Sequence, residues 1–438
     1  MPFFVSPNQC LRICVDGYNF AMPKGTGVAT YGLTLAGMVQ RMGHRVEGLF
    51  GLDVGKNKET QETVLYDLIG SKRQETRKQA RRRIRMEKWQ AIFKPRVREI
   101  AVKGRVETQS FADRIPSFDR LWSASSLFEA AHWHFRYFGS PMTISMADPP
   151  DIMHWTYPLP LRVRGARNIY TLHDLVPLRM PHVTLDDKQF YHKLIKSCIS
   201  QGDRICTVSE ASRNDILEFF PESEYKVINT YQSSLIPDDI RNSNHKNDAD
   251  VIRNIFSLPE KGYFLFFGAI DPKKNIDRII EAYLSSTVKS PLVIVTARDW
   301  GMSGENGGFG ENGLYGRIAS DRIIKLDYLP RTLLFRLIRT AKAVLMPSLL
   351  EGFGLPALEA IQLGTPVIGS STGSLPEVIG KSGLLVDPYS ISDIAEAIEK
   401  MDTDLELYNR FANETAAQSE KFSEERYKSM LEKLYYFI

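Results

Sequence analysis

The sequence predicts an α/β protein with two Rossmann-like domains. Two series of short apolar strands alternate with helical segments, and a polar segment separates the two series. A chain of 438 residues is also too long for one hydrophobic core and fits two domains. We expect a first domain over residues 1–240, a second over 241–421 and a final helix over 422–438.

The composition is that of a globular protein, with 43% apolar and 25% charged residues. No apolar run approaches the roughly 18 residues of a membrane-spanning helix, and the N-terminus lacks the basic start and apolar core of a signal peptide. We therefore expect a cytoplasmic protein. Its cysteines show no metal-ligand spacing, so we expect them to be reduced and mostly buried: Cys10, Cys14, Cys198 and Cys206.

The first domain opens with a strand, Leu11–Val15, a glycine-bearing loop, a helix over about 28–42 that stops at Gly43, and a second strand, Arg45–Phe50. The loop contains Gly25 and Gly27. This pair is not a GxGxxG motif, and it fits an ordinary turn as well as a ligand loop. Its position after the first strand is where ligands of open α/β sheets bind.

Residues 55–105 depart from this alternation as a basic helical insertion. Between Ser71 and Arg105 there are fourteen Lys and Arg against three acids, a net +11, so the rest of the chain sums to 4 − 11 = −7. Lys72–Arg98 favours helix, interrupted by Pro95. Apolar residues recur there at three- and four-residue spacing: Met86, Trp89, Ile92, Phe93, Val97 and Ile100.

Two interpretations of this insertion stay open. The apolar stripe in a basic field can lie on an anionic membrane surface, or it can pack on the domain beneath a solvated charged face. Nucleic-acid binding is disfavoured because no recognised nucleic-acid module surrounds the segment.

Three further strands follow, at Ile152–Trp155, Ile169–Leu172 and Arg204–Val208. His173 and Asp174 come directly after the second of these, so we expect them at the same edge of the sheet as the glycine loop. The alternative is that His173 is a structural residue. Ser209 is expected to cap the next helix, and the polar run Arg241–Asp248 to form the hinge between domains.

The second domain repeats the strand–helix pattern. A turn and helix headed by Asp271–Asn275 and a glycine-rich mobile loop, Gly301–Gly313, lie among its strands. A final helix is expected over Ser423–Phe437. The expected strands are Tyr263–Gly268, Pro291–Thr296, Ile323–Leu326, Ala343–Met346 and Pro366–Gly369.

Glu351 and Glu359 stand around the start of a short helix predicted over about Pro356–Leu363. Proline suits the first helical position, and Gly364 suits the residue that ends the helix. The preceding residues include no Ser, Thr, Asp or Asn to cap the helix, so its free N–H groups can bind a phosphate. The alternative is an ordinary turn with two solvated glutamates.

Taken together, the motifs DPKKN, YLP, MPSLLEGFGLPALEA, GTPVIGSSTGSLPEV and LLVDP resemble the GT-B glycosyltransferases, and more narrowly the retaining family 4 with its E-x7-E motif. The resemblance also covers GTGVATY, TLHDL, TVSEASRNDI and FSEERY. It implies two Rossmann-like domains that face each other across a cleft and a C-terminal helix that crosses back to the first domain. The motifs GAIDPKKN and TLHDLVPL are most similar to those of mannosyltransferases that use GDP-mannose.

The resemblance also implies roles for the donor-binding residues. Glu359 would accept hydrogen bonds from the ribose hydroxyls and Glu351 from a sugar hydroxyl, because ionised carboxylates are pure acceptors. The backbone of Phe353, Gly354 and Leu355 would meet the sugar or the phosphates.

The diphosphate would lie on Lys274. Lys273 stands where relatives usually carry arginine, and lysine cannot form the bidentate fork of arginine. Gly25 and Gly27 would add backbone N–H groups. His173 would orient the sugar or support its developing charge, and Asp174 would hold the ring.

The expected reaction needs no metal, because lysine and a helix N-terminus replace the cation. Retention of configuration without an obvious enzymic nucleophile implies front-face attack by the acceptor hydroxyl. No cofactor or metal is expected; Asp186–Asp187 lies in a helical stretch and is no metal motif. The expected partners are a nucleotide-sugar donor, a saccharide or polyprenyl-diphosphate-linked acceptor and an anionic membrane surface through Lys72–Arg105, at the inner face of the plasma membrane. Nucleic acid is not expected as a partner. The alternatives are a UDP-sugar donor, a nucleotide-sugar epimerase or phosphorylase, and a non-catalytic nucleotide-sugar-binding adaptor.

Overall fold

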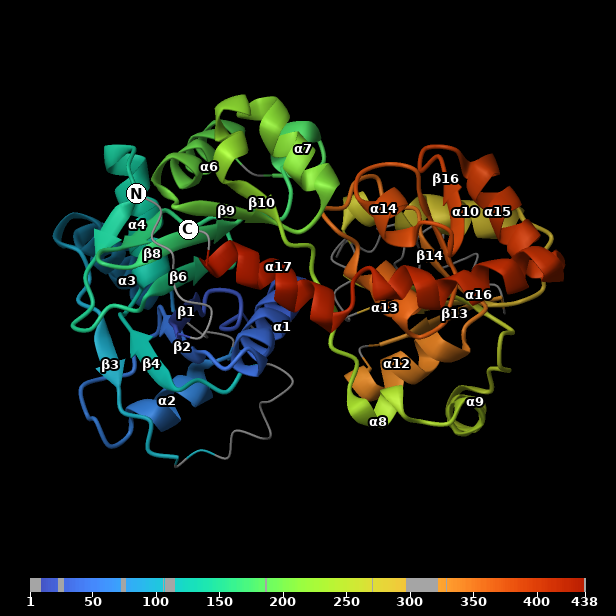
Figure 1. Cartoon of the computed structure of the whole chain (residues 1–438), viewed down its shortest axis with the longest axis horizontal. Helices are drawn as coiled ribbons and strands as arrows, with labels where there is room; N and C mark the ends of the chain where they lie inside the picture. Colours follow the sequence, from blue (N-terminus) through green and yellow to red (C-terminus); the bar gives the residue numbers. More distant parts are fainter. Residues whose placement is uncertain are drawn as a thin grey trace. The chain divides into compact units, whose positions relative to one another are not determined.

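The computed structural model describes residues 9–22, 27–71, 76–104, 106, 115–185, 187–269, 271–296, 322–327 and 329–436. The chain divides into two compact units, each built on its own sheet (Figure 1). Unit 1 comprises Met1–Val208, Ser212–Gln232 and Glu424–Ile438, and unit 2 comprises Ser209–Ala211 and Ser233–Ser423. Gly25 and the predicted loop Gly301–Gly313 lie outside the described residues.

Unit 1 contains an eight-stranded sheet in the order β10-β9-β8-β6-β1-β2-β4-β3. Neighbouring strands are parallel except β3 and β4. A separate parallel pair joins β5 and β7. The strands are β1 (Arg12–Asp16), β2 (Arg45–Phe50), β3 (Arg98–Ile100), β4 (Arg120–Ser123), β5 (Met142–Ile144), β6 (Ile152–Trp155), β7 (Leu161–Val163), β8 (Arg167–Thr171), β9 (Arg204–Thr207) and β10 (Val227–Asn229).

Helices cover both faces of this sheet, with α1 on one side and α6 on the other (Figure 1). The core between the layers contains the fully buried Trp122, Trp155 and Tyr170. The helices are α1 (Gly27–Arg41), α2 (Gln61–Leu68), α3 (Arg77–Phe93), α4 (Leu127–Phe138), α5 (Val176–Arg179), α6 (Lys188–Gln201), α7 (Glu210–Phe219), the 3-10 helix η2 (Pro221–Lys226) and α17 (Glu424–Tyr436).

The last helix, α17, is held to unit 1 by a buried polar contact. His154 on β6 hydrogen-bonds through Nδ1 to the Tyr435 hydroxyl and through Nε2 to Thr171 Oγ1, both at 2.8 Å. Burial lowers the pKa of His154 to about 3, so the ring is neutral when it makes these bonds. The predicted C-terminal helix is therefore present and packs on the first sheet.

Unit 2 contains a six-stranded, fully parallel sheet in the order β13-β12-β11-β14-β15-β16. Its core includes the buried Phe264, Phe266 and Tyr283. The strands are β11 (Phe264–Phe267), β12 (Leu292–Val295), β13 (Ile323–Leu326), β14 (Ala343–Met346), β15 (Val367–Ser370) and β16 (Gly383–Val386). The helices are α8 (Asp238–Arg241), α9 (His245–Phe256), η3 (Pro272–Lys274), α10 (Ile276–Ser285), α12 (Arg331–Thr340), α13 (Leu355–Gln362), α14 (Leu375–Ile379), α15 (Ile391–Thr403) and α16 (Leu405–Glu420).

One sequence prediction needs correction. The run Arg241–Asp248 is not a hinge between the units, because it joins α8 to α9 inside unit 2. The chain passes between the units at Val208–Ser209, Ala211–Ser212, Gln232–Ser233 and Ser423–Glu424. Within Lys72–Arg98, the segment expected to favour helix with an interruption at Pro95, the structure describes the helix Arg77–Phe93. Proline at 95 ends the helical path, and the chain continues into β3.

The four cysteines are free, and three of them are buried, Cys10 being exposed. Among the described residues no helix is long and apolar enough to cross a membrane.

Candidate active site

In unit 2 the ends of two neighbouring strands bring Lys274 and Glu351 together. Strands β11 and β14 are parallel neighbours, η3 follows β11, and the loop with Glu351 follows β14. Because parallel strands end at the same edge of a sheet, both side chains reach one place. Lys274 Nζ donates to Glu351 Oε1 at 2.6 Å.

Glu351 is a buried carboxylate that stays ionised. Burial acts to raise the pKa of Glu351, but the charges of Lys274 and Lys273 outweigh burial and lower it overall. Lys274 keeps two of its three N–H donors beyond the bond to Glu351. Lys274 can thus offer its remaining N–H donors to an anion while it holds Glu351 in place.

Asn275 fixes this arrangement, and the sequence reasoning missed it. The residue is in the left-handed conformation with φ of 62°, and its side-chain amide donates to the carbonyls of Pro347 at 2.9 Å and Pro388 at 2.6 Å. It ties the lysine turn to the ends of β14 and β16. An Asn directly after the Asp-Pro-Lys-Lys turn was an available signal, because Asn tolerates this conformation.

The loop before α13 has its carbonyls occupied. Ser374 Oγ donates to the carbonyls of Glu351 at 3.0 Å and Phe353 at 2.8 Å, and Ser209 Oγ donates to that of Gly352 at 2.6 Å. No hydrogen bond within the described part of the chain uses the N–H groups of Gly354 or Leu355. The N–H side of this loop therefore suits an anion.

Gly354 and Phe353 explain the shape of this loop. Gly354 is the N-cap of α13 with φ of +99°, and a Cβ there would lie 2.6 Å from Leu375 Cδ2, so only glycine fits. Phe353 is buried and packs edge-on against Phe422, with ring centroids 5.5 Å apart. Pro356 is the second helical residue and not the first, because α13 begins at Leu355.

Glu359 lies on α13, eight residues after Glu351 in the sequence. Its Oε1 accepts a hydrogen bond from Ser234 Oγ at 3.2 Å and lies 3.6 Å from Arg331 Nη2. Burial raises the pKa of Glu359, and the charge of Arg331 and the bond from Ser234 offset only part of that rise. The two glutamates are therefore neither solvated nor equivalent, which excludes the interpretation of a plain turn with solvated side chains.

His173 in unit 1 follows β8, as predicted, and belongs to a polar chain at the edge of the first sheet. Its Nε2 donates to the Thr156 carbonyl at 2.8 Å, and the Thr156 hydroxyl donates to the buried carboxylate of Asp16 at 2.9 Å. Burial raises the pKa of Asp16 to about 6. Asp16 and Thr156 were missed because they are distant in sequence and meet only when β1 and β6 pair.

The remaining predicted site residues are placed as follows. Asp174 accepts from the backbone N–H of Val176 at 3.1 Å, and Gly27 is the first residue of α1. Lys273 donates its backbone N–H to Asp271 Oδ1 at 3.0 Å. The chemical roles of these residues stay predictions. Within the described ranges no three His, Cys, Asp or Glu side chains gather as a metal site.

Residues 248–418 match the family model described as "Glycosyl transferases group 1". The chain is 30% identical over 246 residues to O-antigen chain mannosyltransferase B of Escherichia coli, covering 54% of this chain and 61% of that protein. It is 29% identical over 265 residues to serotype-specific mannosyltransferase WbdA of Escherichia coli, covering 59% of this chain and 32% of that protein. The chain thus spans less than two thirds of the length of these relatives.

Among solved structures, sucrose-phosphate synthase from Thermosynechococcus elongatus aligns with a TM-score of 0.62 at 17% identity, over 97% of this chain and 98% of that one. The fold is GT-B, with two Rossmann-like domains whose sheets are parallel except for the edge strand β3 of unit 1, which confirms the predicted fold class.

Proposed function

We propose that this protein is a retaining glycosyltransferase of the family 4 type, which transfers mannose from GDP-mannose to a saccharide or lipid-linked acceptor in surface polysaccharide synthesis. The observation that carries the proposal is the contact of Lys274 with the buried Glu351 beside the open N–H side of α13, inside the region that matches group 1 glycosyltransferases. The mannosyltransferase relatives support the choice of sugar.

In this proposal the donor diphosphate lies on Lys274 and the N–H groups at the start of α13. Negative charge grows on the leaving phosphate as the bond to the sugar breaks. A fixed cation and aligned N–H groups stabilise that charge more in the transition state than in the ground state. Lys273 adds positive charge near the same carboxylate, as its effect on the Glu351 pKa indicates.

Glu351 and Glu359 orient the donor. One oxygen of ionised Glu351 holds Lys274, and the second accepts from a sugar hydroxyl. Glu359 accepts from the ribose hydroxyls in place of its present contact with Ser234. Neither glutamate acts as a nucleophile; the acceptor hydroxyl attacks from the face of the leaving phosphate, which takes its proton. No metal or cofactor takes part in the proposed reaction.

A membrane surface is the second part of the proposal. The exposed apolar residues of α3 lie in a basic field, which suits a peripheral position on anionic lipid at the cytoplasmic face. Sedimentation with lipid vesicles measures this association directly.

The donor base is tested by thermal shift with GDP and UDP. A nucleotide that binds only the folded protein and is present at 100 times its Kd raises the free energy of unfolding by about 2.7 kcal/mol. We expect GDP to raise the melting temperature and UDP to leave it unchanged. A shift with UDP and none with GDP contradicts the mannose assignment and favours a UDP-sugar donor.

A further inference from the structure

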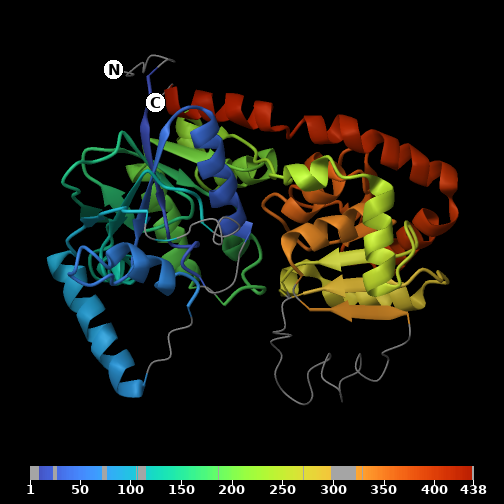
Figure 2. The same ribbon diagram turned by 90° about the horizontal axis from the view of Figure 1, so that it is seen from below.

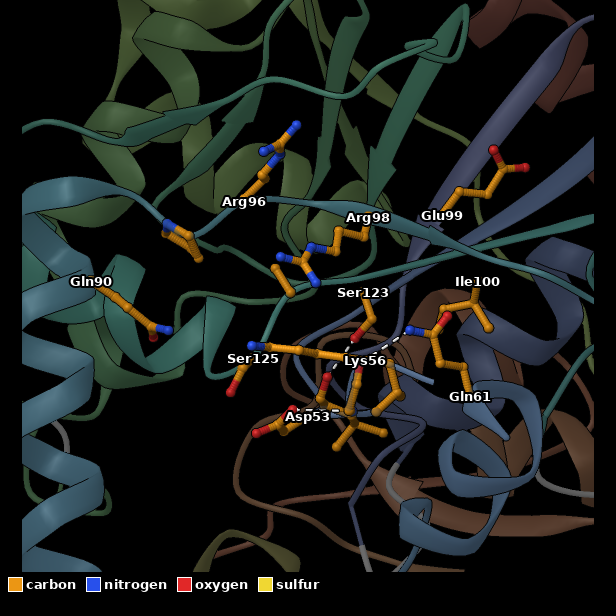
Figure 3. Close-up of a pocket in the computed structure, with 15 residues that line it drawn as sticks. Asp53, Lys56, Gln61, Gln90, Arg96, Arg98, Glu99, Ile100, Ser123 and Ser125 are labelled. Carbon is orange, nitrogen blue, oxygen red and sulfur yellow. Dashed lines mark hydrogen bonds between the residues drawn. The ribbon is translucent and has the colours of Figure 1, made fainter. Parts of the chain in front are cut away.

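A cationic pocket lies at the edge of the first sheet, and His173 and Asp16 are not among its lining residues. It has a volume of about 430 Å³ and is formed at the C-terminal ends of the parallel neighbours β2 and β4, with β3 and the end of α3 (Figure 3). Its lining includes Lys56, Arg96 and Arg98. The lining also includes Gln90 of α3 and Ser125.

The three cations of this pocket lack counterions within the described part of the chain. No ion pair joins Lys56, Arg96 or Arg98 to another described residue. The two acids in the lining are otherwise engaged: Glu99 accepts from Arg120 at 2.8 and 3.0 Å, and Asp53 accepts from the backbone N–H of Gly55. The pocket thus offers net positive charge to an anion.

The side chains are arranged to share one ligand. In Figure 3 Lys56 and Arg98 extend into the same space beside Ser125, while Arg96 lies at the rim. Gln90 adds a side-chain amide whose N–H groups can donate to an anion. A guanidinium, an ammonium and neutral hydrogen-bonding groups together match a phosphate, because charge-assisted bonds to phosphate oxygens are the strongest these side chains form.

An exposed apolar strip begins beside this pocket. Met86, Trp89 and Phe93 are 49%, 55% and 62% exposed, and the Trp89 and Phe93 rings lie 4.7 Å apart. Met86 and Phe93 stand four and three residues from Gln90, so they lie on the same side of the helix as this pocket residue. Figure 2 shows α3 at the margin of unit 1, its N-terminal part extending away from the sheet.

We propose that the pocket binds the phosphate of a lipid-linked molecule, with the lipid chain on the strip of Met86, Trp89 and Phe93. The rest of the ligand extends along the edge of the sheet toward His173. By strand order, His173 after β8 is three to four strand spacings from β2 and β4, or about 14 to 19 Å. A saccharide of more than one sugar ring fits between the phosphate and that position. Assigning this ligand as the acceptor rests on the proposed transferase function; the binding site itself does not.

The test is direct binding of farnesyl diphosphate, as a short lipid diphosphate, and of inorganic diphosphate, measured by calorimetry. We expect the double variant Lys56→Gln/Arg98→Gln to bind farnesyl diphosphate about 100-fold more weakly, roughly tenfold for each charge-assisted contact removed. Arg164→Gln, an exposed arginine elsewhere in unit 1, is the matched control and should change nothing. Arg96→Gln is the second variant. Because Arg96 lies at the rim, we expect it to lose less affinity for farnesyl diphosphate than the double variant does.

The lipid part of the proposal has its own comparison. The wild type should bind farnesyl diphosphate at least tenfold more tightly than inorganic diphosphate, and Trp89→Ser/Phe93→Ser should remove that difference. Equal affinity of the wild type for the two probes would overturn the lipid assignment, and unchanged binding in Lys56→Gln/Arg98→Gln would overturn the pocket itself.

A readout on the other unit separates this proposal from the proposed function. GDP binding should be the same in wild type and Lys56→Gln/Arg98→Gln. If farnesyl diphosphate binding depends on the pocket but the protein transfers no sugar, the pocket stands and the proposed function fails. If sugar transfer occurs and no variant of the pocket alters farnesyl diphosphate binding, the pocket proposal fails alone.

Discussion

Lys274 is the residue on which the proposed chemistry depends most. It is the cation that contacts Glu351, and the fold holds it there through Asn275 and the pairing of β11 with β14. In the proposed reaction the N–H donors of Lys274 that Glu351 does not use bind the donor diphosphate.

Replacing Lys274 with alanine should lower kcat/KM by about 100-fold or more, as loss of a charge-stabilising group does. Lys289→Ala, an exposed lysine elsewhere in unit 2, is the matched control and should keep wild-type kinetics. Initial rates with the donor varied give both values. Activity of the Lys274 variant within about threefold of wild type would remove this residue from the mechanism.

Asp16 makes stability depend on pH in a defined direction. Its pKa is raised by burial to about 6, above the roughly 3.9 of an unfolded chain. The folded state therefore holds the proton more tightly, and the stability that this group contributes is full below about pH 4 and is lost as pH rises through 6.

Asp16→Asn removes this titration. Between pH 4.5 and pH 8 the wild type should lose about 2 kcal/mol of its free energy of unfolding relative to the Asp16→Asn variant. Urea unfolding at the two pH values, followed by tryptophan fluorescence, measures it. A difference between the two proteins that does not change with pH would show that Asp16 titrates normally.

At the scale of elements, α3 is the helix for which the sequence did not decide between a membrane-binding surface and packing on the domain. Its apolar residues Met86, Trp89, Ile92 and Phe93 are exposed, whereas Val97 and Ile100 belong to the segment after the helix and are buried. The helix packs on the domain through Glu87 and Ala91 instead. The stripe therefore splits into a surface part and a core part, which a spacing pattern alone could not reveal.

We expect this surface part to bind anionic membranes. Trp89→Ser/Phe93→Ser should reduce sedimentation with phosphatidylglycerol vesicles by about tenfold or more, because two large apolar side chains leave the interface. Ile255→Ser, an exposed apolar residue on α9, is the control. Equal binding of the wild type to neutral and anionic vesicles would contradict the electrostatic part of the argument.

The predictability of each element follows its local signal. Strands β2, β6, β13 and β14 were predicted with their observed bounds, because each is a short apolar or β-branched run between breakers. Strand β3, Arg98–Ile100, was not predicted, because an edge strand of three residues with two charges carries no such pattern. Its identity depends on antiparallel pairing with β4, which is a tertiary contact.

At the scale of the whole molecule, the sequence indicated candidate site residues but not the residues that hold their loops in place. Glu351 and Glu359 were singled out from a strand end and a helix start, and Lys274 from the resemblance to the family 4 transferases. The structure brings Lys274 and Glu351 into contact. Asn275, Ser374 and Ser209 hold the loops around them but are distant in sequence from the groups they bind. Such contacts become visible only once the strand order is known.

The central claim is that the chain transfers mannose from GDP-mannose with retention. The most direct measurement incubates the protein with GDP-mannose and a lipid-linked saccharide and determines the anomeric configuration of the product by NMR. We expect a product with the α-configuration of the donor, formed only when the acceptor is present. A β-linked product, or free or epimerised sugar formed without acceptor, would contradict the account.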